Sequence, residues 1–231
     1  MRIYYAAVPS EAGVPLVFGL VGNPDVQTER LTEVEGGYRI QIRSTAAVDV
    51  AVFRGSYDQL STQEPIAPSF RLLPEPYLFV PTQYQNLLSA VTSGVEIAAH
   101  WLPATWGRID GSYSAFHVMS HADVASQDPA ALAADANTAQ HQWQLHGSLR
   151  PTPRMQFDAS LYHVGPLSVI GAEAYTRADG RVEFKINRRL SAIATGQNLF
   201  DPAHAEYPSS LAAVVNTTMP RAGNLNLSWT F

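Results

Sequence analysis

Apolar residues recur at every second position along most of this chain. Between positions 34 and 42, Val34, Tyr38 and Ile40 alternate with Glu35 and Arg39. A period of two is typical of β-strands whose two faces meet different surroundings. The same alternation recurs in segments 95–101, 107–115, 142–150, 155–162, 181–187 and 224–231. The pattern predicts an all-β protein with few helices.

The connections between these segments alternate in length. Short ones lie near 43–45, 103–105, 151–153 and 187–189, and longer ones cover about 61–85, 120–139 and 201–220, with a shorter member near 165–173. Tight turns at one end and long loops at the other are typical of transmembrane β-barrels. With a further strand near Arg2 to Ala7, we predict about ten antiparallel strands in up-and-down order, joined without any crossover.

The distribution of charge bears on what surrounds the strands. In the segments with period two, the charged residues fall on the polar face: Glu35, Arg39, Glu96, Arg108, Asp110, Asp158, Glu183 and Lys185. A soluble β-sandwich would show the same alternation. A membrane barrel is favoured because the apolar face holds many Ala and Gly and because the predicted strands exceed the usual ~5–6 residues. An apolar strand ending on Phe231 would also be an aggregation hazard unless its edge were paired, as in a closed barrel.

Composition narrows the function. The chain has 231 residues, with 20 acidic and 15 basic side chains, a net charge of −5 and no Cys. These values argue against a nucleic-acid partner and exclude disulfides and thiol chemistry. The sequence contains no apolar run of about 18 residues, as a membrane helix needs, and its first 20 residues lack the apolar core of a signal peptide. An export signal would therefore lie outside this sequence.

Several polar residues could form a metal or catalytic site, but the pattern favours a structural role for each. His117, His121 and His141 do not have a reliable ligand spacing for strands, so we assign no metal. Asp128 followed by Pro129 predicts the N-cap and first residue of a short helix within a loop. Asn198 and Asp201 are expected to form a turn rather than a catalytic pair. No catalytic residue or cofactor is predicted, and the chain is not expected to be an enzyme.

Several short motifs, in order along the chain, resemble the C-terminal part of TonB-dependent outer-membrane receptors. Gly22-Asn23-Pro24-Asp25 with Glu29 resembles the family's "GNP-acidic … E" segment, and Gly37-Tyr38-Arg39 resembles its "E-x-G-Y-R" strand. Further matches are Val50–Phe53 with Tyr57, Asp58 and Leu60; Gly94-Val95-Glu96; Gly196–Asp201 with His204, Glu206 and Tyr207; Pro220-Arg221; and the terminal Phe231. Val8-Pro9-Ser10 departs from the turn expected after the first strand.

The resemblance covers residues 1–231 and implies one domain, the C-terminal part of a barrel of about 22 strands that encloses a plug. The plug domain and the energy-coupling peptide would be absent from this sequence. The implied protein is a receptor and transporter in the outer membrane of a Gram-negative bacterium. It would take up a large scarce nutrient, most often a ferric siderophore, with cobalamin and oligosaccharides left open. A passive porin-like barrel and a soluble carbohydrate-binding β-sandwich are the alternatives.

The barrel interpretation assigns roles to particular residues. The polar residues expected to face the lumen are Glu35, Arg39, Glu96, Arg108, Asp110, Arg150, Asp158 and Lys185. Aromatic residues expected in the long loops, where they could contact ligand, are Phe70, Tyr77, Phe79, Tyr84 and Tyr207. Leu227, Trp229 and Phe231 form the expected C-terminal signal for the barrel-assembly machinery. The other expected partners are outer-membrane lipid, a TonB-type coupling protein acting through the missing plug region, and a siderophore-like ligand.

Overall fold

The chain is almost entirely β-structure. A computed structural model describes residues 2–8, 13–72, 75–133, 138–168, 171–204 and 218–231. The strands are β1 (Arg2–Val8), β2 (Leu16–Val21), β3 (Arg30–Arg43), β4 (Ala46–Pro65), β5 (Ser69–Arg71), β6 (Tyr77–Ala104), β7 (Gly107–Ala122), β8 (His141–Thr152), β9 (Met155–Val164), β10 (Tyr175–Lys185), β11 (Leu190–Gln197), β12 (Ala203–His204), β13 (Met219–Pro220) and β14 (Ala222–Trp229). One short helix, α1, covers Pro129–Leu132.

The chain divides into two compact units. The first comprises residues 1–34, 54–92 and 118–135, and the second comprises residues 35–53, 93–117 and 136–231. Strands β3, β4, β6 and β7 contribute residues to both units. We call the second unit the wall.

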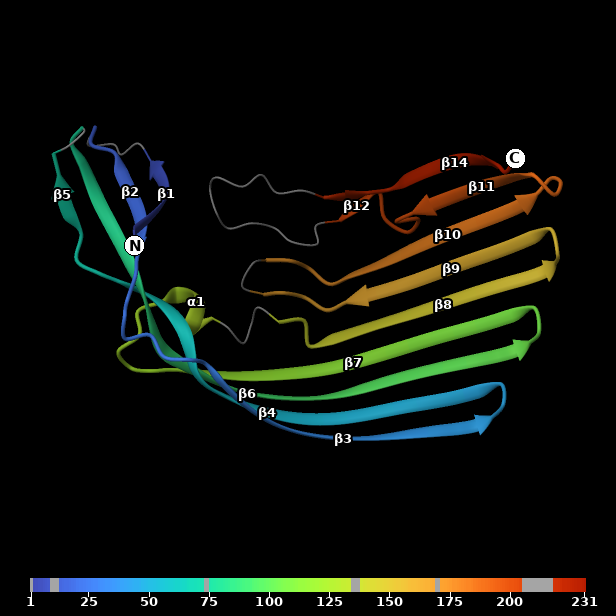
Figure 1. Cartoon of the computed structure of the whole chain (residues 1–231), viewed down its shortest axis with the longest axis horizontal. Helices are drawn as coiled ribbons and strands as arrows, with labels where there is room; N and C mark the ends of the chain where they lie inside the picture. Colours follow the sequence, from blue (N-terminus) through green and yellow to red (C-terminus); the bar gives the residue numbers. More distant parts are fainter. Residues whose placement is uncertain (1, 9–12, 73–74, 134–137, 169–170, 205–217) are drawn as a thin grey trace. The chain divides into compact units, whose positions relative to one another are not determined.

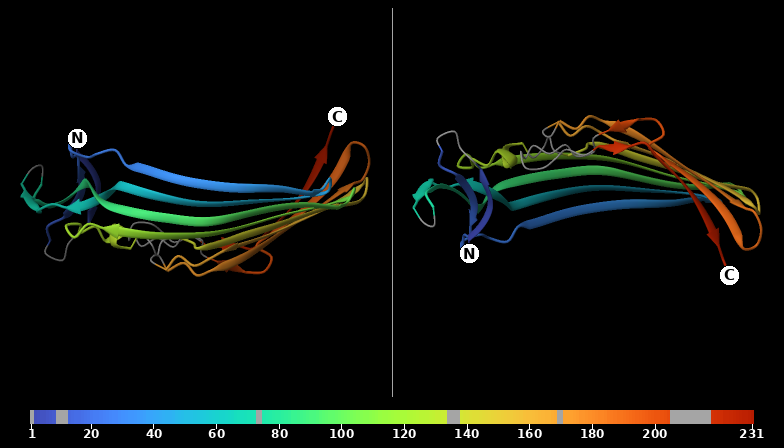
Figure 2. Two further views of the ribbon diagram at one scale, coloured as in Figure 1. Left: turned by 90° about the horizontal axis from the view of Figure 1, so that it is seen from below. Right: turned by 90° about the horizontal axis from the view of Figure 1, so that it is seen from above.

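The wall is an antiparallel meander. Its strands follow the order β6-β7-β8-β9-β10-β11-β14, and β3 and β4 join through the pairing of β4 with β6. The tight turns that connect β3 to β4, β6 to β7, β8 to β9 and β10 to β11 all lie at one end (Figure 1). Strands β8 to β10 belong to a single curved layer (Figure 2). The predicted up-and-down order is confirmed for this unit.

The strand register keeps polar residues on one face of the wall and apolar residues on the other. Asp110 pairs with His146, His146 with Ser160, and Ser160 with Asp179. One residue along, Gly111 pairs with Leu145, Leu145 with Leu161, and Leu161 with Ala178. Directly paired residues in antiparallel strands point to the same side, so each side of the sheet keeps one chemical character across four strands.

The first unit departs from the predicted meander. Strand β2 pairs in parallel with the first part of β6, Leu16 opposite Leu78, and β1 pairs antiparallel with β2. Parallel pairing requires a crossover connection, so the prediction that no crossover occurs is wrong. The predicted 61–85 loop is also wrong in part, because β4 continues to Pro65, β5 covers Ser69–Arg71 and β6 begins at Tyr77.

The predicted helical turn is confirmed. Asp128 is the N-cap of α1, its side chain accepts a hydrogen bond from the Ala130 backbone, and Pro129 opens the helix. Proline suits this position because its fixed φ matches the helix and the missing N–H would have no partner within it. In the described residues, no helix is long and apolar enough to cross a membrane.

Few large apolar side chains are buried in the wall. Leu145 is 43% exposed, Leu225 75% and Trp229 66%, although all three lie on the apolar side of their strands. In a soluble protein such side chains would pack into a core, whereas hydrocarbon requires only an apolar surface. A bilayer is crossed by about 9–11 tilted residues of β-strand, so the 20 residues of β4 and 28 of β6 also extend beyond it.

Candidate functional site: the polar face of the wall

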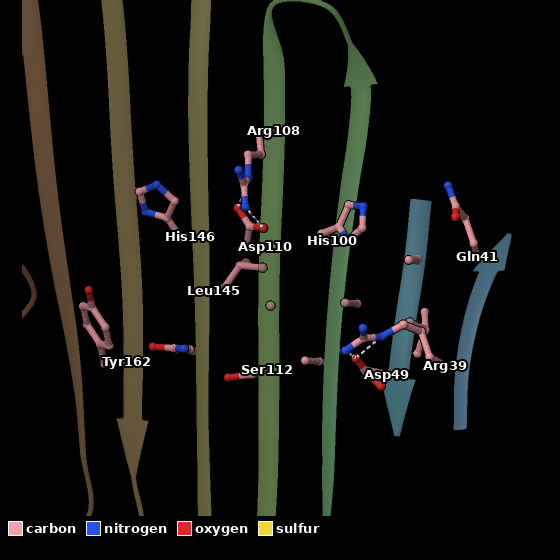
Figure 3. Close-up of a pocket in the computed structure, with 16 residues that line it drawn as sticks. Arg39, Gln41, Asp49, His100, Arg108, Asp110, Ser112, Leu145, His146 and Tyr162 are labelled. Atoms are coloured by element: carbon pink, nitrogen blue, oxygen red, sulfur yellow. Dashed lines mark hydrogen bonds and ion pairs between the residues drawn. The ribbon is translucent and has the colours of Figure 1, made fainter. Parts of the chain in front are cut away.

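The polar side chains of the wall gather along one concavity. An open cavity of about 790 Å³ is lined by residues of β3, β4, β6, β7, β8 and β9. Its labelled side chains, drawn in Figure 3, are Arg39, Gln41, Asp49, His100, Arg108, Asp110, Ser112, Leu145, His146 and Tyr162. Strand alternation explains why the polar side chains converge, because every second residue of adjacent strands projects to the same side. Leu145 belongs to the other, apolar side of β8 and only borders the cavity.

Arginine and carboxylate side chains form ion pairs across this face. Arg108 donates to both carboxylate oxygens of Asp110, at 2.6 and 2.8 Å, and Arg177 donates to Asp179 in the same way, at 2.9 and 2.7 Å. In both pairs the partners are two residues apart on one strand, which places them on the same face. Guanidinium and carboxylate groups match in a two-pronged geometry.

Two further arginines form ion pairs on the same face. Arg39 Nε donates to Asp49 at 2.6 Å, which joins β3 to β4. Arg181 bonds Glu183 at 2.5 Å and Asp158, on β9, at 3.1 Å. These pairs neutralise four arginines of the wall locally, so the polar face is rich in charge and yet not dominated by one sign.

Two histidines flank one of these ion pairs. His100 and His146 lie on either side of Asp110 in Figure 3, and His146 Nδ1 lies 2.9 Å from Ser160 Oγ. Both Asp110 oxygens already accept from Arg108, which reduces their capacity to bind a cation. Among the residues that the structure describes, no group of three or more His, Asp or Glu could hold a metal ion.

The residues predicted to face the lumen are distributed along this face. Arg39, Arg108 and Asp110 line the main cavity, and Glu96 lines a neighbouring one of about 400 Å³ with Asp49. Arg150 and Lys185 line a third cavity of about 610 Å³ near the tight turns. Asp158 pairs with Arg181, and Glu35 lies exposed on β3. The structure thus places the predicted set along one wall rather than in one cluster.

Sequence reasoning missed several residues of this face. Asp49, Arg177 and Asp179 were not selected, although each forms an ion pair. The segment 175–185 alternates throughout, so extending the period backward from Arg181 would have identified Asp179 and Arg177. Asp49 precedes the recognised motif and could have been found in the same way.

Four of the five predicted aromatic ligand contacts lie in strands rather than in loops. Phe70 is in β5, Tyr77 and Tyr84 are in β6, and Phe79 is 4% exposed within β6, beneath the Arg71 guanidinium at 5.8 Å. Phe70 is 56% exposed. Tyr207 lies outside the described residues. The loop assignment is therefore wrong for these residues in β5 and β6, and a ligand role remains a prediction.

The residues predicted as an assembly signal lie at the end of the chain. Leu227 and Trp229 share the apolar face of β14, where Leu227 pairs with Ala192 and Trp229 with Leu190. The rings of Trp229 and Phe231 stack at 6.2 Å. Their exposure to the surroundings is high, at 66% for both Leu227 and Trp229.

Two of the motif residues have clear structural roles. A Cβ atom at Gly94 would approach Phe53 Cζ at 2.4 Å and the Ala115 carbonyl at 2.8 Å, so only glycine fits beside the Phe53 ring. Phe53 in turn contacts Phe116, with ring centroids 5.9 Å apart. Asn198 is completely buried with φ of 52°, and its side-chain amide donates to the Met219 carbonyl. This confirms the predicted turn at Asn198.

A buried polar cluster, which the sequence did not indicate, fixes the segment around α1. Glu64 accepts hydrogen bonds from Ser126 Oγ and the Gln127 backbone, each at 2.6 Å, and Asp128 accepts one from the Gln63 backbone at 2.7 Å. We call Glu64, Ser126 and Asp128 the clasp. Burial would raise the pKa of the Glu64 carboxyl, but hydrogen bonds from Ser126, Gln127, Thr62 and Asp128 together hold that pKa below its ordinary value.

Side-chain hydrogen bonds tie the motif segment from Gly22 to Glu29 to β4 and β6. Asn86 accepts from the Gln27 backbone at 2.7 Å and donates to the Gln27 and Gln59 carbonyls. The Ser61 hydroxyl and the Ser61 backbone N–H both donate to the Glu29 carboxylate. These bonds lower the pKa of Glu29, and the hydroxyl has the larger effect. The motif therefore has a structural role in the first unit.

The fold and the polar face define the wall of a transmembrane β-barrel. Residues 3–199 match the family described as TonB dependent receptor-like, beta-barrel. The chain belongs to this family. Its proteins lie in the outer membrane of Gram-negative bacteria, which confirms the fold and the location predicted from the sequence. The soluble β-sandwich alternative is wrong.

Solved structures show the same fold at low identity. The siderophore receptor PirA from Pseudomonas aeruginosa is 15% identical with a TM-score of 0.62, and the match covers 100% of this chain and 35% of that one. The siderophore receptor PirA from Acinetobacter baumannii is 14% identical with a TM-score of 0.65, covering 93% and 34%. The copper transporter OprC is 12% identical with a TM-score of 0.63, covering 90% and 33%. No curated protein sequence matches.

The chain thus spans about a third of the length of these structures. At these identities the likeness concerns the fold.

Proposed function

We propose that this chain forms part of the barrel wall of a receptor for energy-coupled uptake of a large scarce nutrient, with a ferric siderophore as the favoured substrate. Membership of the TonB-dependent receptor family is the observation that carries the proposal. The siderophore assignment is supported by solved structures of the same fold that are siderophore receptors.

The polar face would line the lumen in this proposal. The eight residues predicted for that role share the polar face of their strands, and an apolar face opposite them suits lipid. Locally neutral ion pairs such as Arg108 with Asp110 leave hydrogen-bonding groups available without creating a strong field of one sign. Such a surface could contact a plug, water or a passing solute. Coupling to a TonB-type protein would act through a plug region.

A copper complex is a second candidate substrate. His100 and His146 place imidazole groups on the polar face, imidazole is a common copper ligand, and one structure of the same fold is titled a copper transporter. Transient binding to these imidazoles would suit a copper complex that passes through the barrel.

Uptake assays test the proposal. The gene encoding this chain would be expressed in a Gram-negative host that lacks its own siderophore receptors, and uptake of radiolabelled ferric catecholate, ferric hydroxamate and copper complexes would be measured with and without an uncoupler. We expect uptake of one ferric siderophore that the uncoupler abolishes. Uptake that the uncoupler leaves unchanged would support a passive pore instead, and energised uptake of copper alone would favour the second candidate.

A further inference from the structure

Three histidines lie on the apolar face of the wall, opposite the proposed lumen. The register pairs Ala115 with His141 and Trp143 with His163, so both histidines project to the same side as Leu145 and Leu161. His117 is two residues beyond Ala115 on β7 and therefore points to that side as well. His117, His141 and Ala115 line a common depression. In a membrane barrel this side faces lipid.

All three histidines lie about one bilayer crossing from the tight turns. About 9–11 tilted residues cross the hydrocarbon. Strand β8 covers 12 residues from His141 to the turn end at Thr152, and β9 covers 10 residues from the turn end at Met155, with His163 next to last. Strand β7 starts from its turn at Gly107 and reaches His117 in a similar length. The histidines thus lie at the external boundary between hydrocarbon and water.

Aromatic neighbours hold two of the imidazole rings. Tyr113 stacks on His141, with centroids 6.1 Å apart, and its hydroxyl lies 2.8 Å from His141 Nδ1. Trp143 stacks on His163 at 5.6 Å, and His163 Nδ1 lies 2.9 Å from Thr176 Oγ1. When a hydroxyl donates to Nδ1, the neutral ring carries its proton on Nε2. Each ring then offers an N–H donor on a fixed support.

The chemistry of this surface suits an anionic headgroup. In strands β7 to β11, the Asp, Glu, Lys and Arg side chains lie on the opposite face, so no carboxylate of these strands repels an anion here, and the histidines supply N–H donors. Phosphate oxygens are strong acceptors for N–H donors, and Trp and Tyr concentrate at headgroup depth. We propose that His117, His141 and His163 form a docking surface for the phosphate groups of lipids in the external leaflet.

Lipid retention tests this proposal directly. The full chain, folded in maltoside micelles that contain no phosphate, would be titrated with phosphatidic acid or with diacylglycerol of the same acyl chains, and bound lipid would be counted by native mass spectrometry. We expect phosphatidic acid to bind about tenfold more tightly than diacylglycerol. The double variant His141→Phe/His163→Phe, which keeps an aromatic ring but has no N–H donor, should lose most of this preference.

The matched control is the double variant His100→Phe/His146→Phe, which removes two histidines from the polar face and should keep the full preference. Equal binding of the two lipids to the unaltered chain, or an unchanged preference in His141→Phe/His163→Phe, would overturn the proposal. If that variant fails to fold, His117→Phe and Tyr113→Phe serve in its place, since an unchanged preference in both would have the same meaning. Lipid binding is independent of transport, so either result leaves the uptake proposal standing.

Discussion

The two units of the chain are stabilised in different ways. In the wall, two-residue alternation and strand register create one apolar and one polar face, and large apolar side chains such as Leu145 and Leu225 remain exposed. In the first unit, polar side chains are buried and paired, with Thr62 at 1%, Glu64 at 5% and Asp128 at 8% exposure. The stability of the wall thus depends on having lipid on one side and water on the other, whereas the stability of the first unit depends on specific hydrogen bonds.

This difference implies different sensitivities to mutation. A charge on the apolar face of the wall should be costly because hydrocarbon cannot solvate it, while a charge on the polar face should be tolerated. In the first unit the largest effects should come from removing single donors or acceptors, because a buried polar group without a partner is destabilising. Substitutions in the two units should therefore change the free energy of unfolding by different amounts.

Leu145→Arg should have the largest effect. Leu145 lies near the middle of β8 on the apolar face, where arginine destabilises a barrel by about 2–4 kcal/mol in the bilayer. The matched control is Gln144→Arg, the neighbouring residue on the polar face, with an expected change below about 0.5 kcal/mol. Urea unfolding in lipid vesicles measures both. Equal destabilisation by the two variants would contradict the two-faced wall.

Gly94→Ala should destabilise the wall by about 1–3 kcal/mol, as overpacking does. The added Cβ would meet Phe53 Cζ at 2.4 Å and the Ala115 carbonyl at 2.8 Å. Gly147→Ala is the matched control, because nothing lies within 4 Å of a Cβ at Gly147. The same unfolding assay applies. If the Gly94 and Gly147 variants were equally stable, the close approach of Phe53 to Gly94 would be refuted.

Acid should loosen the clasp. The pKa of Glu64 is lowered in the folded chain, so its stabilising contribution is present above the carboxyl's ordinary pKa and is lost as the pH falls through the lowered folded pKa. Hydrogen exchange at the Gln127 and Gln63 backbone amides should therefore lose protection on acidification from about pH 6 to about pH 3, after correction for the intrinsic rate.

Glu64→Gln is the control for this pH effect. The amide keeps the size of the side chain and removes its titration, so the loss of protection should become independent of pH, with a constant local destabilisation of about 1–3 kcal/mol. If the Glu64→Gln variant retained the original pH dependence, another carboxyl would be responsible for the loss of protection.

The Arg39–Asp49 pair should contribute least. Its side chains are 77% and 43% exposed, and exposed ion pairs contribute little because solvent screens the charges. A double-mutant cycle with Arg39→Gln and Asp49→Asn measures the coupling free energy. The corresponding cycle for Arg177 and Asp179, which are 21% and 20% exposed, should give a larger value. A larger coupling free energy for Arg39 and Asp49 than for Arg177 and Asp179 would show that burial does not control the strength of these ion pairs.

The wall could be predicted largely from the sequence. Alternation around Asp110 and Leu145 identified both faces, and the tight turns were found because turn residues interrupt the period. The parallel pairing of Leu16 with Leu78 could not be predicted, because non-local pairing leaves no period in the sequence. The clasp escaped for a related reason, since Glu64 and Ser126 are far apart in the chain and each alone resembles an ordinary polar residue. Of the site, the charged residues followed from alternation, but partners on neighbouring strands, such as Asp158 for Arg181, required the register.

The most direct test of the two-faced wall is the depth of one tryptophan. In a chain carrying Trp101→Phe, Trp106→Phe, Trp143→Phe and Trp229→Phe, the added substitution Leu145→Trp places one tryptophan on the apolar face, and a companion chain with Gln144→Trp in its place reports on the polar face. In vesicles, lipids brominated on their acyl chains should quench the tryptophan at position 145 strongly and the one at position 144 weakly. Quenching of the tryptophan at position 145 by aqueous iodide but not by brominated lipid would contradict the assignment of this face to hydrocarbon.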